Sequence, residues 1–234
     1  PDYCDASGAL SPLAAFTNNQ GIAAQHAEVL GVGSAAMAKK GEFWLTVHTR
    51  VDLFARAEMM DSLTVRTWAE ACSERDMRTY RSYTLSRGET LIARGKTEWA
   101  VLGPDKRIIR FSDYGFPEDY PFRAESAIPE TLQRFHEKFT EDDLFSRYTV
   151  RPTDIDLGRH MNNIAYVRLL LDCFTAQELA SGKIRSVELH FSTSCFEGEE
   201  LTVYRKLHDD GTCRIGIVKA DGKTASQACV TLEN

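Results

Sequence analysis

The sequence predicts an α+β protein of two similar halves, in which each half is a long helix followed by an antiparallel sheet. Two stretches have apolar residues at helical spacing, and eight others alternate apolar and polar residues with a period of two. The order of one helix and four strands occurs twice, at a period of roughly 140–150 residues. This recurrence indicates an internal duplication of architecture.

The first half covers residues 1–110. Its helical pattern runs from Leu10 to Leu30, and Gly31 then gives a C-terminal stop signal. Period-two alternation follows in four segments separated by turn residues, at 43–53, 63–68, 79–85 and 92–102. Four strands at hairpin spacing form an antiparallel sheet, and the helix before them must cover one of its faces.

Residues 111–143 break this rhythm and connect the halves. They are rich in proline and aromatic residues, which predicts a linker packed against the sheets, with a short helix from Pro129 to Phe139. The second half, residues 144–234, begins with a strand at 147–150 and a polar loop. An apolar helix then continues to about Ala180, and four further alternating segments follow at 184–192, 201–207, 212–219 and 224–232.

Composition and charge restrict the function. A hydrophobic content of 43% is ordinary for a globular protein with a real core. The net charge of −6 argues against nucleic-acid binding, which normally needs a basic face. Basic residues do crowd the segment 75–110; a solvated strand face and a surface for an acidic partner both remain open.

The six cysteines show no CxxC pair and no zinc-like spacing, so we expect no metal site and a reduced compartment. The chain has no signal peptide and no apolar run of about 18 residues, and we therefore expect a cytoplasmic protein outside the membrane. It begins abruptly at Pro1, so an upstream segment could be missing.

The stretch 151–171, RPTDIDLGRHMNNIAYVRLLL, is where chemistry is expected. A polar loop with Asp154, Asp156 and His160 leads into the apolar helix, and Asn162 or Asn163 is a good N-cap. The free N–H groups of the first helical turn could polarise an acyl carbonyl, and a nearby carboxylate or imidazole could activate water against it. A capped helix start without catalytic function is the simpler alternative.

A long helix wrapped by an antiparallel sheet, made twice, is the hotdog architecture. The run TDIDLGRHMNNIAYVRLL resembles the Asp-x-x-x-His-[Val/Met]-Asn-Asn-x-x-Tyr signature of hotdog thioesterases. In the first half, AAQHAEVLGVG, GEFWLTVHTRVDLF and SLTVRTWAE resemble the first repeat of the acyl-ACP thioesterases, a plant and bacterial double-hotdog family. The resemblance covers nearly the whole chain. It implies a tandem hotdog of two antiparallel sheets, each wrapped around a long central helix.

The resemblance also implies site residues. By position, Asp156 and His160 match the family's catalytic Asp and His, and Cys195 matches a cysteine one strand later. Two expected side chains are absent, because Gly158 stands where the family has Asn and Ser194 where it usually has Glu.

Two mechanisms remain open on these residues. In one, Cys195 is the nucleophile and His160 its base, but the absence of an Asn at position 158 removes the group that would orient the histidine. In the preferred scheme, Asp156 activates water or attacks directly, and His160 orients it or donates a proton. The loop backbone around Gly158, Asn162 and Asn163 then holds the oxyanion. Asp154 is expected to be structural.

We therefore expect a thioester hydrolase that releases fatty acid from acyl carrier protein (ACP), with no metal or organic cofactor, since the phosphopantetheine arm enters with the substrate. ACP is acidic and would meet basic residues near the tunnel mouth. An acyl-CoA thioesterase and a non-catalytic acyl-binding hotdog are the alternatives. Either a monomer or a homodimer is compatible with two fused repeats. His26, on the first helix, is a core histidine or part of the acyl tunnel.

Overall fold

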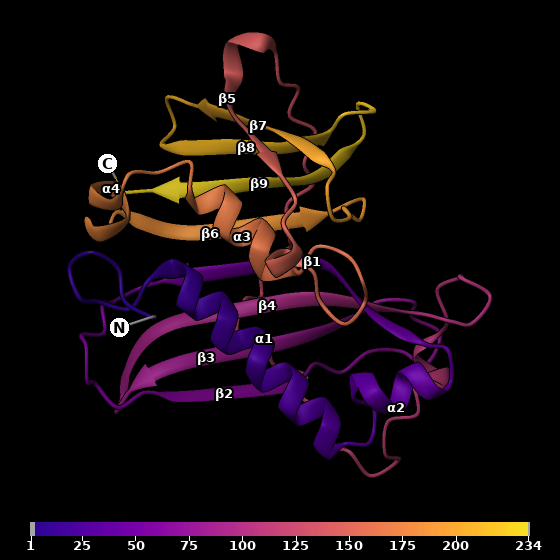
Figure 1. Cartoon of the computed structure of the whole chain (residues 1–234). Helices are drawn as coiled ribbons and strands as arrows, with labels where there is room; N and C mark the ends of the chain where they lie inside the picture. Colours follow the sequence, from indigo (N-terminus) through magenta and orange to yellow (C-terminus); the bar gives the residue numbers. More distant parts are fainter. Residues whose placement is uncertain (1–2, 234) are drawn as a thin grey trace.

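The computed structural model describes residues 3–233 and contains a continuous sheet of nine antiparallel strands (Figure 1). Their spatial order is β2-β3-β4-β1-β6-β9-β8-β7-β5. The N-terminal half supplies β1 (Phe43–Leu53), β2 (Thr64–Ala69), β3 (Thr79–Arg87) and β4 (Thr90–Leu102). The C-terminal half supplies β5 (Leu144–Thr149), β6 (Ile184–Phe191), β7 (Glu200–Leu207), β8 (Thr212–Lys219) and β9 (Thr224–Leu232). The predicted double hotdog is thereby confirmed.

The two predicted sheets are joined edge to edge. Strand β1 pairs with β6 in an antiparallel register that runs from His48 opposite His190 to Asp52 opposite Ser186. An open sheet edge exposes a row of unpaired N–H and C=O groups, which invites association with other chains. Joining β1 to β6 satisfies one edge of each half and leaves β2 and β5 as the outer strands.

Helix α1 (Pro12–Val29) covers the inner face of the first four strands, as the sequence predicts (Figure 1). Ser11 caps it, accepting a hydrogen bond from the N–H of Ala14 at 3.1 Å, and Pro12 begins the first turn. The helix ends before Gly31, whose φ of +74° suits glycine. A short helix that the sequence pattern did not reveal, α2 (Ser34–Lys39), follows it.

Helix α3 (Asn163–Leu171) is shorter than predicted, because the apolar pattern to Ala180 contains a second helix, α4 (Ala176–Ala180). The Thr175 hydroxyl accepts a hydrogen bond from the N–H of Glu178 at 3.1 Å, and the Glu178 carboxylate accepts one from the N–H of Thr175 at 2.7 Å. This capping box starts a new helix and so ends the continuous pattern. Six of the nine residues of α3 are buried, which places it in the core of the second half.

The short helix predicted at 129–139 is wrong. The linker has single 3-10 turns at Phe111–Asp113 and Glu141–Asp143, and residues 129–139 form neither helix nor strand. Side chains of the sheet take the place of helical partners, since Glu188 accepts the N–H of Gln133 at 2.5 Å. Phe139 lies where a Cβ at Gly216 would come within 2.3 Å of its ring. Tertiary contacts therefore override the local helix signal.

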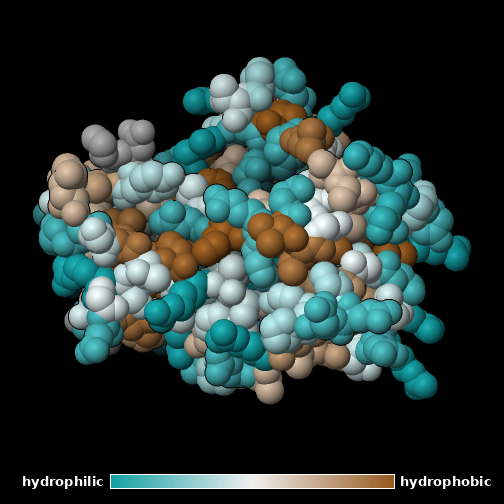
Figure 2. Space-filling model, turned by 90° about the horizontal axis from the view of Figure 1, so that it is seen from below, coloured by the Kyte–Doolittle hydropathy of each residue, from teal (hydrophilic) through white to brown (hydrophobic). Residues whose placement is uncertain are grey.

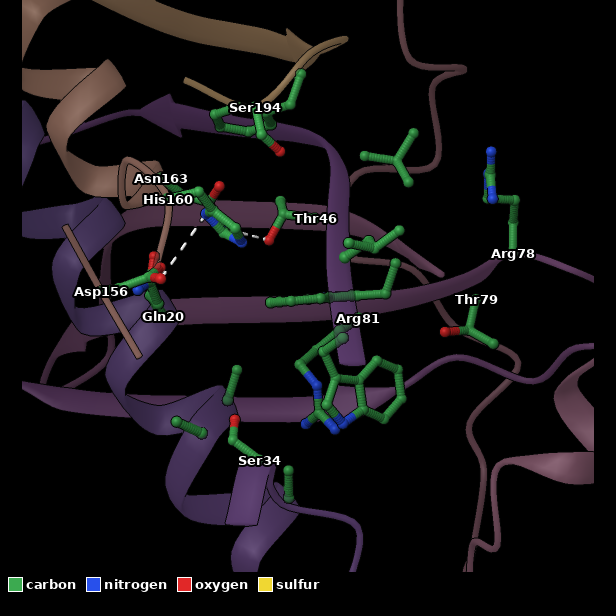
Figure 3. A pocket seen from close by; sticks show the side chains of 18 of the residues that line it. Gln20, Ser34, Thr46, Arg78, Thr79, Arg81, Asp156, His160, Asn163 and Ser194 are labelled. Carbon is green, nitrogen blue, oxygen red and sulfur yellow. Dashed lines mark hydrogen bonds and ion pairs between the residues drawn. The ribbon is translucent and has the colours of Figure 1, made fainter. Parts of the chain in front are cut away.

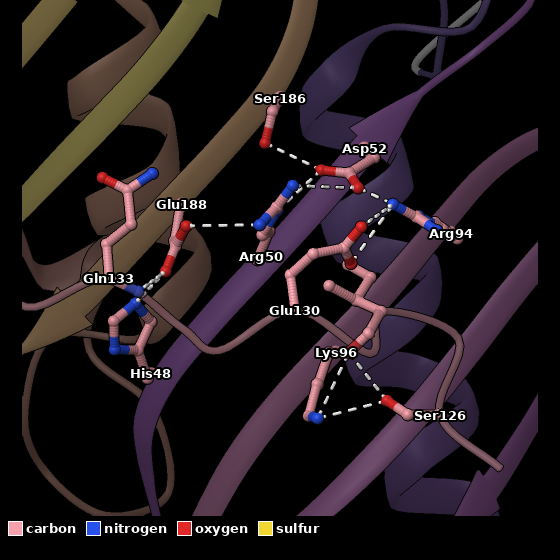
Figure 4. Close-up of polar contacts among 11 residues, drawn as sticks. His48, Arg50, Asp52, Arg94, Lys96, Ser126, Glu130, Gln133, Ser186 and Glu188 are labelled. Carbon is pink, nitrogen blue, oxygen red and sulfur yellow. Dashed lines mark hydrogen bonds and ion pairs between the residues drawn. The ribbon is translucent and has the colours of Figure 1, made fainter.

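A buried polar network lies beneath the linker at the joint between the halves (Figure 4). The carboxylate of Asp52 accepts hydrogen bonds from Arg50 Nε at 2.8 Å, Arg94 Nε at 2.9 Å and Ser186 Oγ at 2.8 Å. His48 Nε2 lies 2.9 Å from Glu188 Oε1. Because buried charges are tolerated when paired and hydrogen-bonded, the network fixes the register of β1, β6 and the linker.

Candidate active site

A cavity of about 430 Å³ lies between the two halves (Figure 3). Its walls come from one face of α1, the first part of β1, the start of β3, the loop before α3 and the segment after β6. The volume falls within the range of small-molecule sites. Both halves are therefore needed to form the cavity, and the second half brings the polar loop to it.

Asp156 and His160, the two residues expected to be catalytic, both line this cavity. The Asp156 carboxylate accepts hydrogen bonds from the N–H of Gly158 at 2.8 Å and from Asn162 Nδ2 at 3.3 Å. His160 Nδ1 lies 3.7 Å from Asp156 Oδ1. Arg159, which lies between them in the loop, has a φ of +60°, an uncommon conformation outside glycine.

The two asparagines have different roles at the start of α3. Asn162 is the N-cap, and its Oδ1 accepts a hydrogen bond from the N–H of Ile164 at 2.8 Å. Asn163 Nδ2 donates to Thr46 Oγ1 at 2.7 Å, which ties the helix to β1 of the other half (Figure 3). The N-terminus of α3 is thereby held against the cavity.

Asp154 does not line the cavity, which agrees with its expected structural role. It is 1% exposed and accepts hydrogen bonds from the Tyr148 hydroxyl at 2.6 Å, the N–H of Arg151 at 2.8 Å and the Arg168 guanidinium. Burial alone would raise the pKa of Asp154, but these hydrogen bonds and the Arg168 charge outweigh it and hold the pKa below the usual value. Its carboxylate anchors the loop.

Cys195 is not placed as a nucleophile. Its side chain is fully buried outside the cavity lining, and the Sγ atom lies 4.0 Å from the carbonyl oxygen of Thr193. Burial raises the pKa of the thiol, although a hydrogen bond with Tyr166 opposes this. Since the thiolate is the reactive form, a buried thiol with a raised pKa is a poor nucleophile.

Ser194 lines the cavity, but its hydroxyl cannot supply the charge of the expected Glu. Its carbonyl oxygen accepts a hydrogen bond from Lys219 Nζ at 3.0 Å. At Gly158, an added Cβ would lie 2.7 Å from His160 Nε2 and 3.1 Å from Asp156 Oδ1. The present arrangement of Asp156 and His160 therefore requires the glycine.

Two cavity residues, Gln20 and Thr46, were not singled out by sequence reasoning, and Arg81 was noted only as one of the basic residues of segment 75–110. Gln20 Nε2 lies 3.5 Å from Asn162 Oδ1, so α1 also contacts the catalytic loop. A signal for Arg81 does exist in the sequence. It is a charged residue that alternates with the same period as buried Thr79 and Tyr83, which places it on the core-facing side of β3.

Within residues 3–233, no group of three or more His, Cys, Asp or Glu side chains could hold a metal ion. No helix in the same range is both long and apolar enough to span a bilayer.

Comparisons with known proteins identify the family of the chain. The model of the acyl-ACP thioesterase N-terminal domain matches residues 3–112, and that of the C-terminal domain matches residues 137–234. A chloroplastic oleoyl-acyl carrier protein thioesterase of Coriandrum sativum is 22% identical over 193 residues, covering 75% of this chain and 52% of the relative. The chain thus spans about half the length of the curated relatives it matches.

Solved structures show the same fold over the whole chain. An acyl-ACP thioesterase from Bacteroides thetaiotaomicron superposes with a TM-score of 0.82 at 20% identity, covering 100% of this chain and 94% of the other. The 12:0-ACP thioesterase from Umbellularia californica gives a TM-score of 0.81 at 16% identity, with the same two coverages. Because both family models match in order and together span nearly the whole chain, the protein belongs to the acyl-ACP thioesterase family.

Proposed function

We propose that this protein hydrolyses the thioester of a fatty acyl chain carried on acyl carrier protein. Family membership supports the reaction class. For this chain, the proposal rests on one observation. Asp156 and His160 lie together at a cavity beside the N-terminus of α3, and two hydrogen bonds hold the Asp156 carboxylate. This is the arrangement that general-base hydrolysis of an acyl group needs.

In the proposed mechanism, Asp156 accepts a proton from a water molecule as its oxygen bonds to the thioester carbonyl carbon. The carbonyl oxygen gains negative charge, which the positive end of the α3 dipole stabilises; the N–H groups of Ile164 and Ala165 are already bonded to Asn162. Collapse of the intermediate breaks the C–S bond, and the thiolate of the phosphopantetheine arm leaves. His160 orients the water or relays the proton from Asp156 to the leaving sulfur.

The hydrogen bonds around Asp156 suit a general base whose carboxylate must be held in one orientation. Gly158 and Asn162 each donate to a different carboxylate oxygen, so the side chain is oriented. Asn163, tied to Thr46 at 2.7 Å, holds the helix tip to the wall of the cavity. A fixed dipole at a helix tip stabilises developing charge without reorganising during the reaction.

The first prediction separates this mechanism from a cysteine nucleophile. Asp156→Asn keeps the size of the side chain and removes the base, so we expect kcat to fall by about 10²–10⁴-fold. Cys195→Ala removes a buried thiol outside the cavity, so thioester hydrolysis should persist in every preparation that folds. Activity is measured with matched acyl-ACP and acyl-CoA substrates over a series of chain lengths.

The controls make the result decisive. Thermal melting and circular dichroism establish that both variants are folded. Full activity of Asp156→Asn, or loss of activity in a folded Cys195→Ala, would refute the assigned roles. Faster turnover of acyl-CoA than of matched acyl-ACP would favour the alternative carrier, and binding without turnover in the wild type would favour an acyl-binding protein. The cytoplasmic location and the state of monomer or homodimer stay predictions.

A further inference from the structure

Arg81 is a buried cation without a carboxylate partner. It is 7% exposed, and it forms no ion pair within residues 3–233. Its Nη1 donates to His26 Nδ1 at 2.8 Å and to Thr67 Oγ1 at 3.3 Å, while Nε and Nη2 make no hydrogen bond there. A buried guanidinium is normally compensated by a carboxylate.

The same side chain lines the cavity. Figure 3 shows Arg81 on the side of Ser34, away from the labelled Asp156 and His160. The neighbouring Arg78 also lines the cavity, but it has a carboxylate partner, since its Nε lies 3.3 Å from Glu98 Oε1. Of these two arginines, Arg81 is therefore the one whose positive charge remains available to a ligand.

The remaining N–H groups of Arg81, on Nε and Nη2, have no acceptor among the described residues. A cavity wall that presents such donors is better matched to a ligand with acceptor oxygens than to a plain hydrocarbon.

His26 does not compete with such a ligand. Burial, and then the Arg81 charge, lower the pKa of His26, so its ring is neutral at neutral pH and accepts from Arg81. It leaves the positive charge of Arg81 unneutralised.

The surroundings also allow an anionic group at this point. His26 and Thr67, the two partners of Arg81, line a groove between α1 and β2 on the outer surface. Figure 2 shows the molecule from this side, where apolar residues form a band among hydrophilic ones. Because Arg81 lies between the cavity and a solvent-facing groove, a bound carboxylate need not be stripped of all water.

We propose that the cavity accepts an acyl chain that carries an oxygen acceptor, best a carboxylate, remote from the thioester, and that Arg81 binds this group. The proposal rests on the proposed thioester hydrolysis. Arg81 is then the residue that selects a polar-ended acyl chain, since a planar guanidinium matches a carboxylate with two parallel hydrogen bonds. A plain acyl chain would leave these donors unpaired.

The test compares substrates of equal chain length that end in a methyl, a hydroxyl or a carboxylate group, each loaded on acyl carrier protein. In the wild type we expect the highest kcat/KM with the carboxylate end. In Arg81→Met the ratio of carboxylate to methyl substrates should fall by about 10- to 100-fold, mainly through KM. Arg81→Lys should retain part of the ratio, since lysine keeps the positive charge but cannot donate two parallel hydrogen bonds to one carboxylate.

Arg107→Met serves as the matched control, because Arg107 is exposed on a loop outside the cavity. It should leave the ratio unchanged. Should Arg81→Met fail to fold, Arg81→Lys and Arg81→Gln carry the comparison. An equal ratio in the wild type and in folded Arg81 variants, or a wild-type preference for the methyl end at every length, would overturn the proposal.

A binding arm keeps the two proposals distinguishable. The same three chains, joined to pantetheine through an amide that resists hydrolysis, are titrated calorimetrically into the wild type and Arg81→Met. Loss of tight binding of the carboxylate analogue in Arg81→Met supports the role of Arg81 even if no thioester is cleaved. Turnover of plain chains with no effect of Arg81 on any analogue would leave the hydrolase and remove this specificity.

Discussion

At the scale of single residues, the catalytic loop depends on a glycine where its family resemblance predicts an asparagine. The missing side chain at Gly158 leaves room for His160 Nε2, which a Cβ would approach to 2.7 Å. The N–H of Gly158 also orients the Asp156 carboxylate. The loop is therefore adapted to work without a side chain at this position.

This adaptation gives a residue-scale prediction. In Gly158→Ala the new methyl group should push His160 and Asp156 out of position and reduce kcat by about 10- to 100-fold. The melting temperature should change little, because Gly158 lies on an exposed loop and its φ is not positive. Steady-state kinetics and calorimetry check both parts. A fully active Gly158→Ala would show that the loop tolerates the displacement.

At the scale of elements, α1 has a weak point that packing does not explain. Gly21 lies in the interior of this 18-residue helix, and an added Cβ would meet nothing within 4 Å. Glycine inside a helix is less favourable than alanine because it loses more backbone entropy on folding. The helix therefore gives up stability at this position for no contact in return.

We accordingly expect Gly21→Ala to raise the free energy of unfolding by about 0.5–1 kcal/mol, with thioester hydrolysis unchanged. Urea denaturation followed by circular dichroism measures the change. The variant also serves as the added-methyl control for Gly158→Ala. A decrease in stability would mean that the glycine is needed for the packing of α1 on the sheet.

At the scale of the whole molecule, two half-buried histidines make stability depend on pH. Burial, and then the Arg81 charge, lower the pKa of His26; burial, and then the charges of His48 and Arg78, lower that of His190. The unfolded chain, with histidine pKa near 6.5, then binds protons that the folded chain excludes. The resulting stability is present above about pH 6.5 and is lost as the pH falls through the lowered values.

The melting temperature should therefore fall as the pH drops from neutral toward about pH 5, before the carboxylates, with ordinary pKa values near 4, begin to titrate. Scanning calorimetry across this window gives the slope. Replacing both histidines by glutamine should flatten it. A constant melting temperature in the wild type would contradict the assigned direction of the two pKa shifts.

Much of the fold could be predicted from the sequence, because periodicity is a local property. Alternation of period two located the strands, and helical spacing located α1 and the start of α3. The linker at 129–139 could not be predicted, because its backbone donates to side chains of the sheet, such as Glu188, that lie far away in sequence. The break between α3 and α4 was missed because the apolar pattern continues across the Thr175 cap.

The sequence by itself determined the chemistry that is available: a carboxylate, an imidazole and an N-cap within eight residues, Asp156 to Asn163, ahead of an apolar helix. Only the tertiary structure decided which groups meet a ligand. It buried Cys195 outside the cavity, tied Asn163 to Thr46, and left Arg81 facing the cavity without a counterion. The physical reason is that proximity along the chain follows from sequence, whereas burial and charge pairing depend on distant segments that the fold brings together.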